Sequence, residues 1–197
     1  MENRLQSDVR ILDDLILDVI RMEGWYSDQP ADSGNYNSEG TLVGTTYGIS
    51  ANVYEAYTGI VPTKEQMELM PLIHAIDIYK TNYVTPITNN MGIPISSVVF
   101  PQVFDMNINH GYGNTVKLIQ QVLGLDVDGA CGKITKGAIK KVLLNSPNSF
   151  NNDLSVERRD FYLSIIDGDP DQEVFRKGWL KRADSFLINK KQVGLIT

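Results

Sequence analysis

Apolar residues recur at helical spacing near the start of the chain. Between residues 8 and 22 they stand three or four positions apart, as they do on the buried face of an amphipathic helix. The members of this face are Val9, Ile11, Leu12, Leu15, Ile16, Val19 and Ile20. The pattern predicts a helix that ends near Glu23-Gly24.

The next stretch, residues 25–48, loses this periodicity. It is rich in Gly, Asn, Ser, Asp and Pro, with Tyr and Thr among them. This composition predicts a long loop or an irregular hairpin, and only its flanks are candidates for strands. A loop of this length is uncommon in a compact domain unless it has a function.

Helical patterns return over most of the remaining chain. They predict helices at 51–58, 64–69, 71–83, 98–110, 114–123, 135–144, 155–166 and about 171–189. Ser50 and Ser155 could cap two of these helices. Thr63 and Gln66 have the spacing of a capping box.

The segments between these helices contain breakers. Residues 85–96, with Pro86 and Pro94, are interpreted as a polar connection. Gly111 and Gly113 separate two predicted helices, and a turn over residues 128–132 precedes another. Convincing alternating strands are few, so the predicted class is mainly α with at most a small irregular β-hairpin.

Charge and composition exclude several classes of protein. Residues 1–105 carry five basic and fourteen acidic side chains, whereas residues 106–197 carry thirteen and ten. Nucleic-acid binding requires a basic face, so no nucleic-acid partner is expected. The mildly basic C-terminal part suits an anionic polymer such as cell wall, although ordinary solvated surface has the same charge pattern.

The compartment and the cofactors follow from similar arguments. Asp13, Asp14 and Asp18 interrupt the first apolar stretch, which therefore predicts neither a signal peptide nor a membrane span. The single cysteine, Cys131, excludes an internal disulfide and fits a reducing compartment. There is no cluster of Cys and His at ligand spacing, so we expect no metal and no cofactor.

Two carboxylates beside the polar loop suggest a reaction. Cleavage of a glycosidic bond requires a protonated acid at the leaving oxygen and a second group on the opposite face of the sugar. Glu23 follows an apolar helix and precedes Trp25 and Tyr26, where removal from water would favour the protonated form. Asp32 lies among small polar residues and would stay ionised. By spacing alone the pair is weak evidence, because any charged surface offers such pairs.

The residues around this pair form a more specific pattern. The segments are Glu23-Gly24-Trp25-Tyr26, Pro30-Ala31-Asp32-Ser33-Gly34 and Thr45-Thr46-Tyr47-Gly48-Ile49-Ser50. This pattern resembles the signature of glycoside hydrolase family 108, which contains N-acetylmuramidases found as phage endolysins and as bacterial secretion activator proteins. The resemblance implies a lysozyme-like fold, with Glu23 as the general acid and Asp32 as its partner. It also implies an active-site threonine, either Thr45 or its rival Thr46.

Three further blocks follow in the family's order. Phe104–Gly111 resembles a helix of the family, and Phe175–Arg182 resembles a motif near its C-terminus. Leu118–Gly124, followed by Asp128–Gly132 and Thr135, resembles its predicted peptidoglycan-binding segment. The resemblance implies a catalytic lobe over residues 1–105 and a helical lobe with the peptidoglycan-binding segment over residues 106–197, or one compact unit of both.

Several polar and aromatic side chains are candidates for substrate binding. Asp105 and Asn109 stand four apart and share one helix face, where they could line a cleft. Alternatively, Asp105 caps the helix and Asn109 bonds to backbone. Aromatic faces suit sugar rings, although some of these side chains could pack as core. The remaining candidates are Trp25, Tyr26, Tyr36, Thr46 and Tyr47.

The chain departs from the family pattern in two places. Trp25 replaces a glycine, and residues 35–44 form an insertion between Gly34 and Thr45. We interpret the insertion as an arm over the cleft that carries Tyr36. The alternative is a structural hairpin in which Leu42 and Val43 are buried.

The expected activity is hydrolysis of the β-1,4 bond between N-acetylmuramic acid and N-acetylglucosamine in peptidoglycan. The expected agent is a phage endolysin or a virion-associated lysin, made in the cytoplasm and delivered to the wall by a holin or by a phage particle. We expect a monomer outside such a particle. The alternatives are a lytic transglycosylase and a non-catalytic wall-binding or phage structural module.

Overall fold

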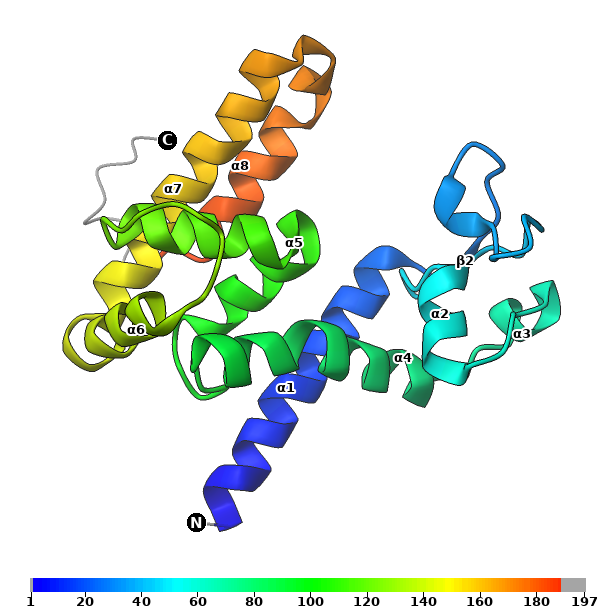
Figure 1. Ribbon diagram of the computed structural model, residues 1–197, viewed down its shortest axis with the longest axis horizontal. Coiled ribbons are helices and arrows are strands. Elements are labelled where there is room, and N and C mark those ends of the chain that lie inside the picture. The colour runs from blue at the N-terminus through cyan, green and yellow to red at the C-terminus, as the bar shows by residue number, and fades with distance from the viewer. Residues whose placement is uncertain (1, 189–197) are drawn as a thin grey trace. The chain divides into compact units, whose positions relative to one another are not determined.

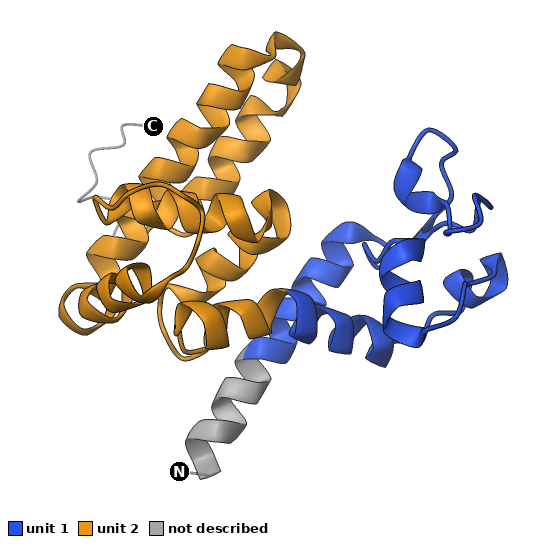
Figure 2. Cartoon of the chain, in the orientation of Figure 1, with its two compact units in different colours: residues 1–82 blue, residues 83–197 orange. Residues whose placement is uncertain are grey.

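The computed structural model describes residues 2–188, with side chains from residue 12 onward. The chain forms two compact units, one up to Asn82 and one from Tyr83 (Figure 2). This division falls elsewhere than the lobes 1–105 and 106–197 expected from the sequence. Each unit is described by itself.

The first unit is helical around one small hairpin (Figure 1). Leu12, Ile16, Val19 and Ile20 of α1 are buried and Leu15 is half-buried, which confirms this part of the predicted apolar face, and α1 packs against α4. The side chains of Val9 and Ile11 lie outside the described residues. The elements are α1 (Glu2–Glu23), β1 (Tyr26–Ser27), the 3-10 helix η1 (Ser33–Asn35), β2 (Thr45–Thr46), α2 (Ala51–Thr58), α3 (Lys64–Glu68) and α4 (Leu72–Tyr79). The π-helical segment η2 (Lys80–Val84) spans the boundary between the two units.

The hairpin confirms that the strands lie at the flanks of the polar loop. Tyr26 pairs with Thr46 and Ser27 with Thr45, antiparallel. Gly44 precedes β2 with φ of 91°, and a Cβ on it would lie 2.4 Å from the Tyr26 ring. Only glycine fits both the backbone and this close approach.

The insertion, residues 35–44, is anchored at both ends. The side chain of Asn35 is fully buried and that of Val43 is 1% exposed. The Asn35 amide donates to the Gln29 carbonyl, and the Asn37 amide donates to the Pro62 carbonyl. The interpretation as a free arm is therefore wrong for the ends of the insertion. The burial of Val43 supports the structural hairpin, whereas Leu42 is only half-buried and residues 38–41 are exposed.

The second unit is built from helices. Helices α7 and α8 lie side by side, and α5 packs against α7 (Figure 1). Gly111, at φ 74° and ψ 162°, breaks α5 into the two helices that the sequence predicts. The elements are the π-helical segment η3 (Pro86–Met91), α5 (Phe100–Val122), α6 (Lys133–Asn145), α7 (Pro147–Gly168), the 3-10 helix η4 (Pro170–Phe175) and α8 (Arg176–Asp184).

Three local predictions are wrong. Residues 86–91 are helical instead of a polar connection, because Pro86 occupies a first turn where proline is tolerated, and Ile87 and Met91 are buried. Ser155 is not a cap but is buried inside α7, where its hydroxyl donates to the Asn151 carbonyl. The last helical stretch is a 3-10 turn followed by an α-helix that ends at Asp184, and residue 189 lies outside the described residues.

Other predicted caps differ in detail. Thr63 and Gln66 form the complete capping box of α3, as predicted. Ser50 occupies the N-cap position of α2 without a hydrogen bond from its side chain. Within the described residues, no helix is long and apolar enough to cross a bilayer.

Candidate active site

Glu23 is the last residue of α1 and stands directly before the hairpin. Gly24 follows it with φ of 86°, a left-handed conformation that lets the chain turn from the helix into β1. The Glu23 side chain is exposed. The expectation that apolar packing removes this carboxyl from water is therefore wrong for the free protein.

The turn after β2 forms a surface against which Glu23 lies. Tyr47 and Gly48 both have positive φ, 54° and 74°. A Cβ on Gly48 would lie 2.9 Å from Glu23 Cγ and 2.9 Å from the Tyr79 hydroxyl oxygen. The Tyr79 hydroxyl donates to the Tyr47 carbonyl at 3.0 Å, which fixes this turn. Glu23, Gly48 and Tyr79 are thus neighbours.

Tyr79 is a site residue that the sequence reasoning missed. In the sequence, Tyr79 is only one position of the helix predicted over residues 71–83. No local motif links it to Glu23, because the hairpin lies between the two residues in the chain. Its side chain is 2% exposed and its ring belongs to the core, while its hydroxyl reaches the turn at Gly48.

Gly48→Ala should lower turnover about 10²-fold, because an added methyl would displace the Glu23 side chain from its place. The matched control is Gly59→Ala. Gly59 has the same φ of 74°, but a Cβ there meets nothing within 4 Å. Initial rates on purified walls and melting temperatures should be measured for both. Equal losses of rate would mean that backbone strain alone is responsible.

Asp32 caps the short helix η1. One carboxylate oxygen, Oδ1, accepts from the Gly34 amide at 2.8 Å, and the residue is exposed. This is the turn-forming geometry expected of an Asp before Gly. Oδ1 is thereby oriented, and Oδ2 has no hydrogen bond among the described residues.

The two threonines of β2 point to opposite sides, as alternation along a strand requires. The Thr46 hydroxyl is buried and donates to the Met67 carbonyl. The Thr45 hydroxyl lies 3.4 Å from the Gly34 carbonyl and the residue is half-buried. Thr45 is therefore the threonine on the side of the Asp32 loop.

Trp25 is the most exposed aromatic candidate. Its side chain is 78% exposed, and its ring centroid lies 5.5 Å from that of Tyr47, which is buried. Both rings border a pocket of about 320 Å³. The other lining residues are Leu17, Ile20, Arg21 and Leu72. An exposed ring beside an apolar pocket suits the flat face of a sugar.

Tyr26 and Tyr36 have their hydroxyls bound within the loop. The Tyr26 hydroxyl donates to the Val43 carbonyl at 3.1 Å, and the Tyr36 hydroxyl donates to the Pro30 carbonyl at 3.1 Å. Burial raises the pKa of Tyr26 above its ordinary value. Both side chains hold the loop in place, and only the ring faces remain for contact with a substrate.

A larger pocket of about 440 Å³ lies between α2 and the end of α4. The sequence analysis did not single out its lining, whose amide, hydroxyl and aromatic groups are suited to sugars. The residues are Asn52, Val53, Ala56, Tyr57, Ile78, Thr81 and Asn82. A signal was present, because Asn52 and Ala56 stand four apart on one face of a predicted helix.

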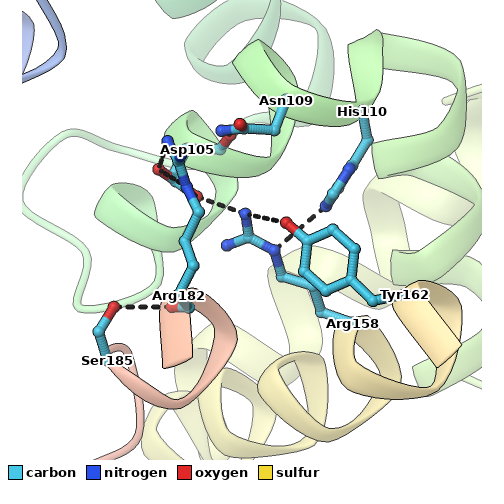
Figure 3. Close-up of polar contacts among 7 residues, drawn as sticks. All are labelled: Asp105, Asn109, His110, Arg158, Tyr162, Arg182 and Ser185. Carbon is cyan, nitrogen blue, oxygen red and sulfur yellow. Dashed lines mark hydrogen bonds and ion pairs between the residues drawn. The ribbon is translucent and has the colours of Figure 1, made fainter. Parts of the chain in front are cut away.

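Asp105 belongs to the second unit, where it is buried in an ion-pair cluster (Figure 3). Its carboxylate accepts from the guanidinium groups of Arg158 on α7 and Arg182 on α8. Asn109 is exposed and donates to the Asp105 carbonyl at 2.7 Å. Asn109 therefore makes the bond to backbone that was the alternative to a role in lining a cleft. The Asp105 bonds make it the centre of a structural cluster.

Arg158 and His110 complete this cluster. Arg158 is fully buried, and it donates from Nε to His110 Nε2 at 3.1 Å and from Nη2 to the Tyr162 hydroxyl at 3.0 Å. Burial and the Arg158 guanidinium lower the pKa of His110 to about 4. The imidazole is therefore neutral in the folded protein at neutral pH, as its acceptor role requires.

The lowered pKa of His110 makes the second unit less stable in acid. The unfolded chain binds a proton near the ordinary pKa of 6.5, whereas the folded chain binds it near 4. The free energy of unfolding is therefore highest above pH 6.5 and decreases as the pH falls toward 4. We expect a decrease of about 2 kcal/mol, which allows for solvent screening of the partly exposed ring. Urea unfolding at pH 7 and pH 4.5 should show this loss in the wild type and a smaller loss in His110→Gln. Identical losses would exclude His110 as the source.

Within residues 12–188, no group of three or more His, Cys, Asp or Glu side chains could hold a metal ion.

Two family models match the chain. Residues 16–111 match glycosyl hydrolase 108, and residues 114–184 match the predicted peptidoglycan domain. The first match ends at Gly111, where α5 breaks. A solved structure of Brucella abortus SagA is similar to 89% of this chain and 90% of its own, with 27% identity and a TM-score of 0.65. No curated protein matches the chain. The chain thus contains a segment similar to glycosyl hydrolase 108 followed by a predicted peptidoglycan domain, and it is a glycoside hydrolase that acts on peptidoglycan.

Proposed function

We propose that the protein is an N-acetylmuramidase that hydrolyses the β-1,4 bond between N-acetylmuramic acid and N-acetylglucosamine. The observation that carries the proposal is the position of Glu23, at the end of α1 and against Gly48, within the segment that matches glycosyl hydrolase 108. Glu23 is the general acid, which protonates the glycosidic oxygen as the bond breaks. A sugar ring bound over the exposed carboxyl would itself take Glu23 out of water.

Asp32 and Thr45 act on the other side of the sugar. Asp32 is held by the Gly34 amide through one oxygen, which leaves the other oxygen for the substrate or for water. Thr45 contributes a hydroxyl on the same side of the hairpin. The carboxylate stabilises the developing positive charge or activates the attacking water, according to its distance from the anomeric carbon.

The reaction products test this proposal. Purified walls are digested, the fragments are reduced with borohydride, and their masses are measured. A muramidase adds one water per bond broken and leaves N-acetylmuramic acid at the reducing end. Anhydro-sugar ends would identify a lytic transglycosylase, and N-acetylglucosamine at the reducing end would identify a glucosaminidase. Either result would overturn the proposal.

Asp32→Asn should lower turnover by about 10²-fold or more, because a neutral amide neither stabilises positive charge nor deprotonates water. The amide oxygen can still accept from the Gly34 amide, so the loop should keep its conformation. The control is Asp28→Asn, a neighbouring carboxylate that is paired with Lys64 at 2.8 Å. Steady-state rates on walls compare the two. Full activity in Asp32→Asn would leave Asp32 as a turn residue only.

We also propose that the protein acts as a monomer and reaches the wall by a separate delivery route, through a holin pore or with a phage particle. The support is the similarity of its sequence motifs to those of phage endolysins. If so, a bacterium that produces the protein in its cytoplasm should lyse only after its membrane is permeabilised. Lysis without permeabilisation would contradict this route.

A further inference from the structure

Helix α6 carries an isolated concentration of positive charge. Its thirteen residues contain Lys133, Lys136, Lys140 and Lys141 and no acidic side chain, in a chain with a net charge of −6. All four lysines are exposed. The basic character of the second half of the sequence is thus strongest on one helix.

The four lysines lie on one face. At the α-helical rotation of about 100° per residue, they fall within one half of the circumference. The opposite side holds Thr135 and Ile139, which are 4% and 1% exposed. The basic face therefore points away from the core of the second unit.

This face has no anionic partner among the described residues. None of the ion pairs formed by residues 12–188 includes a lysine of α6. Lys136 Nζ lies 3.4 Å from the Asn89 carbonyl, which is neutral. Four like charges on one face repel one another and lower the stability of the helix. Apart from the hydrogen bond of Lys136, the described residues give these charges no partner, which points to an external anion.

The centre of the face is a glycine. Gly137 lies between the lysines, and a Cβ on it would meet nothing within 4 Å. Glycine inside a helix is destabilising relative to alanine, and here no neighbour requires it. Its effect is to leave a flat surface between the basic side chains. At the edges of this surface, Ile134 and Leu144 are 79% and 76% exposed.

We propose that the face formed by Lys133, Lys136, Gly137, Lys140 and Lys141, the α6 basic face, binds the carboxylates of peptidoglycan stem peptides. Peptidoglycan is the polymer on which this enzyme acts, and its stem peptides carry carboxylates that recur along each glycan strand. Lys133 and Lys140 stand about 10 Å apart along the helix axis, so one face contacts several groups of an extended polyanion. Gly132 caps α6 without a side chain, and the helix dipole adds positive potential at Lys133.

The basic face holds the enzyme on the wall through a contact separate from bond cleavage. Because such contacts are screened, wall binding should weaken steeply with ionic strength. The proposal does not rest on the role of Glu23. Binding and cleavage are measured separately, so either can fail without the other.

The test is a sedimentation assay of the full chain with purified, insoluble walls, in a Glu23→Gln background that limits digestion. The double variant Lys133→Gln, Lys140→Gln should raise the apparent dissociation constant about tenfold at low salt. The matched control is Lys177→Gln, Lys181→Gln on α8, which removes the same charge from another exposed helix. Equal losses in both pairs would mean that net charge alone matters and would overturn the proposal.

A second variant separates binding from stability. Gly137→Glu places a negative charge at the centre of the face and replaces glycine with a better helix former. It should abolish wall binding without lowering the melting temperature. Unchanged binding in this variant would also overturn the proposal.

Treated walls and vesicles identify the anion. Amidation of the wall carboxylates should reduce binding of the wild type to the level of the double variant. Removal of phosphodiester polymers with hydrofluoric acid should leave binding unchanged. Loss after the acid treatment would assign the face to those polymers. If the double variant lost binding only to anionic lipid vesicles and kept its binding to walls, the α6 basic face would instead be a membrane-binding surface.

Discussion

Glu23→Gln is expected to remove wall-cleaving activity, with a loss of about 10²–10⁴-fold in turnover. Glutamine has the size and shape of glutamate but cannot supply a proton to the leaving oxygen. The contact with Gly48 is made by Glu23 Cγ, which glutamine retains, so the local fold should not change. Release of soluble muropeptides from purified walls gives the rate.

The control for this experiment is the melting temperature, which should match that of the wild type. Trp25 and Tyr47 form a ring pair next to Glu23, so near-ultraviolet circular dichroism reports on the same site. A variant with an unchanged spectrum and a rate near that of the wild type would show that Glu23 is not the acid. Asp32 would then become the first alternative.

Asp105→Ala is expected to destabilise the second unit by about 3–5 kcal/mol. The substitution leaves the fully buried Arg158 and the partly buried Arg182 without the carboxylate that neutralises both. Breaking a buried ion pair from one side costs this much because a charge remains without a partner in a medium of low polarity. The hydrogen bonds that Arg158 donates to His110 and Tyr162 provide no negative charge in return.

The measurement is urea unfolding followed by tryptophan fluorescence. In a Trp25→Phe background, the remaining Trp179, which stacks on Tyr162 at 5.0 Å between centroids, reports on the second unit. The control is Asn109→Ala, which removes an exposed side chain from the same helix and should cost about 1 kcal/mol or less. If Asp105→Ala unfolded like the wild type and lost only substrate affinity, Asp105 would line the cleft as first expected.

The local chemistry of the sequence predicts several helix ends. Gly24, Thr63 with Gln66 and Gly111 each impose a conformation through their own backbone or side chain, and each appears where expected. The same holds for the two strands, which lie at the flanks of the polar stretch as its composition predicts. These features require no information from distant residues.

The failures share a cause, which is a partner far away in sequence. Ser155 is a residue type that often caps helices, but α5 packs against α7 and Ser155 is fully buried there. Asp105 and Asn109 share a helix face, yet Arg158 and Arg182 lie 53 and 77 positions further along the chain. Val43 belongs to an insertion that looks polar, and only the fold buries it. Pattern and spacing carry no signal for such contacts.

The placement of Tyr79 beside Glu23 is a similar case. The helix that carries Tyr79 is predictable, but the approach of its hydroxyl to Gly48 depends on how α4 packs against α1. The family motif identifies the acid and its loop because those residues are close in sequence. The motif does not include Tyr79, which fixes the turn beside Glu23.

The ion-pair cluster of the second unit limits where two related genes can recombine. Asp105 lies in the segment of the hydrolase family, whereas Arg158 and Arg182 lie in the peptidoglycan segment that begins at residue 114. A recombination event between residues 111 and 114 would join an acid from one parent to arginines from another. In such a chimera the buried charges are neutralised only when both parents carry Asp105, Arg158 and Arg182. The boundary between the two family segments is therefore a poor crossover point, and a natural or engineered exchange should succeed more often when it moves α5, α7 and α8 together.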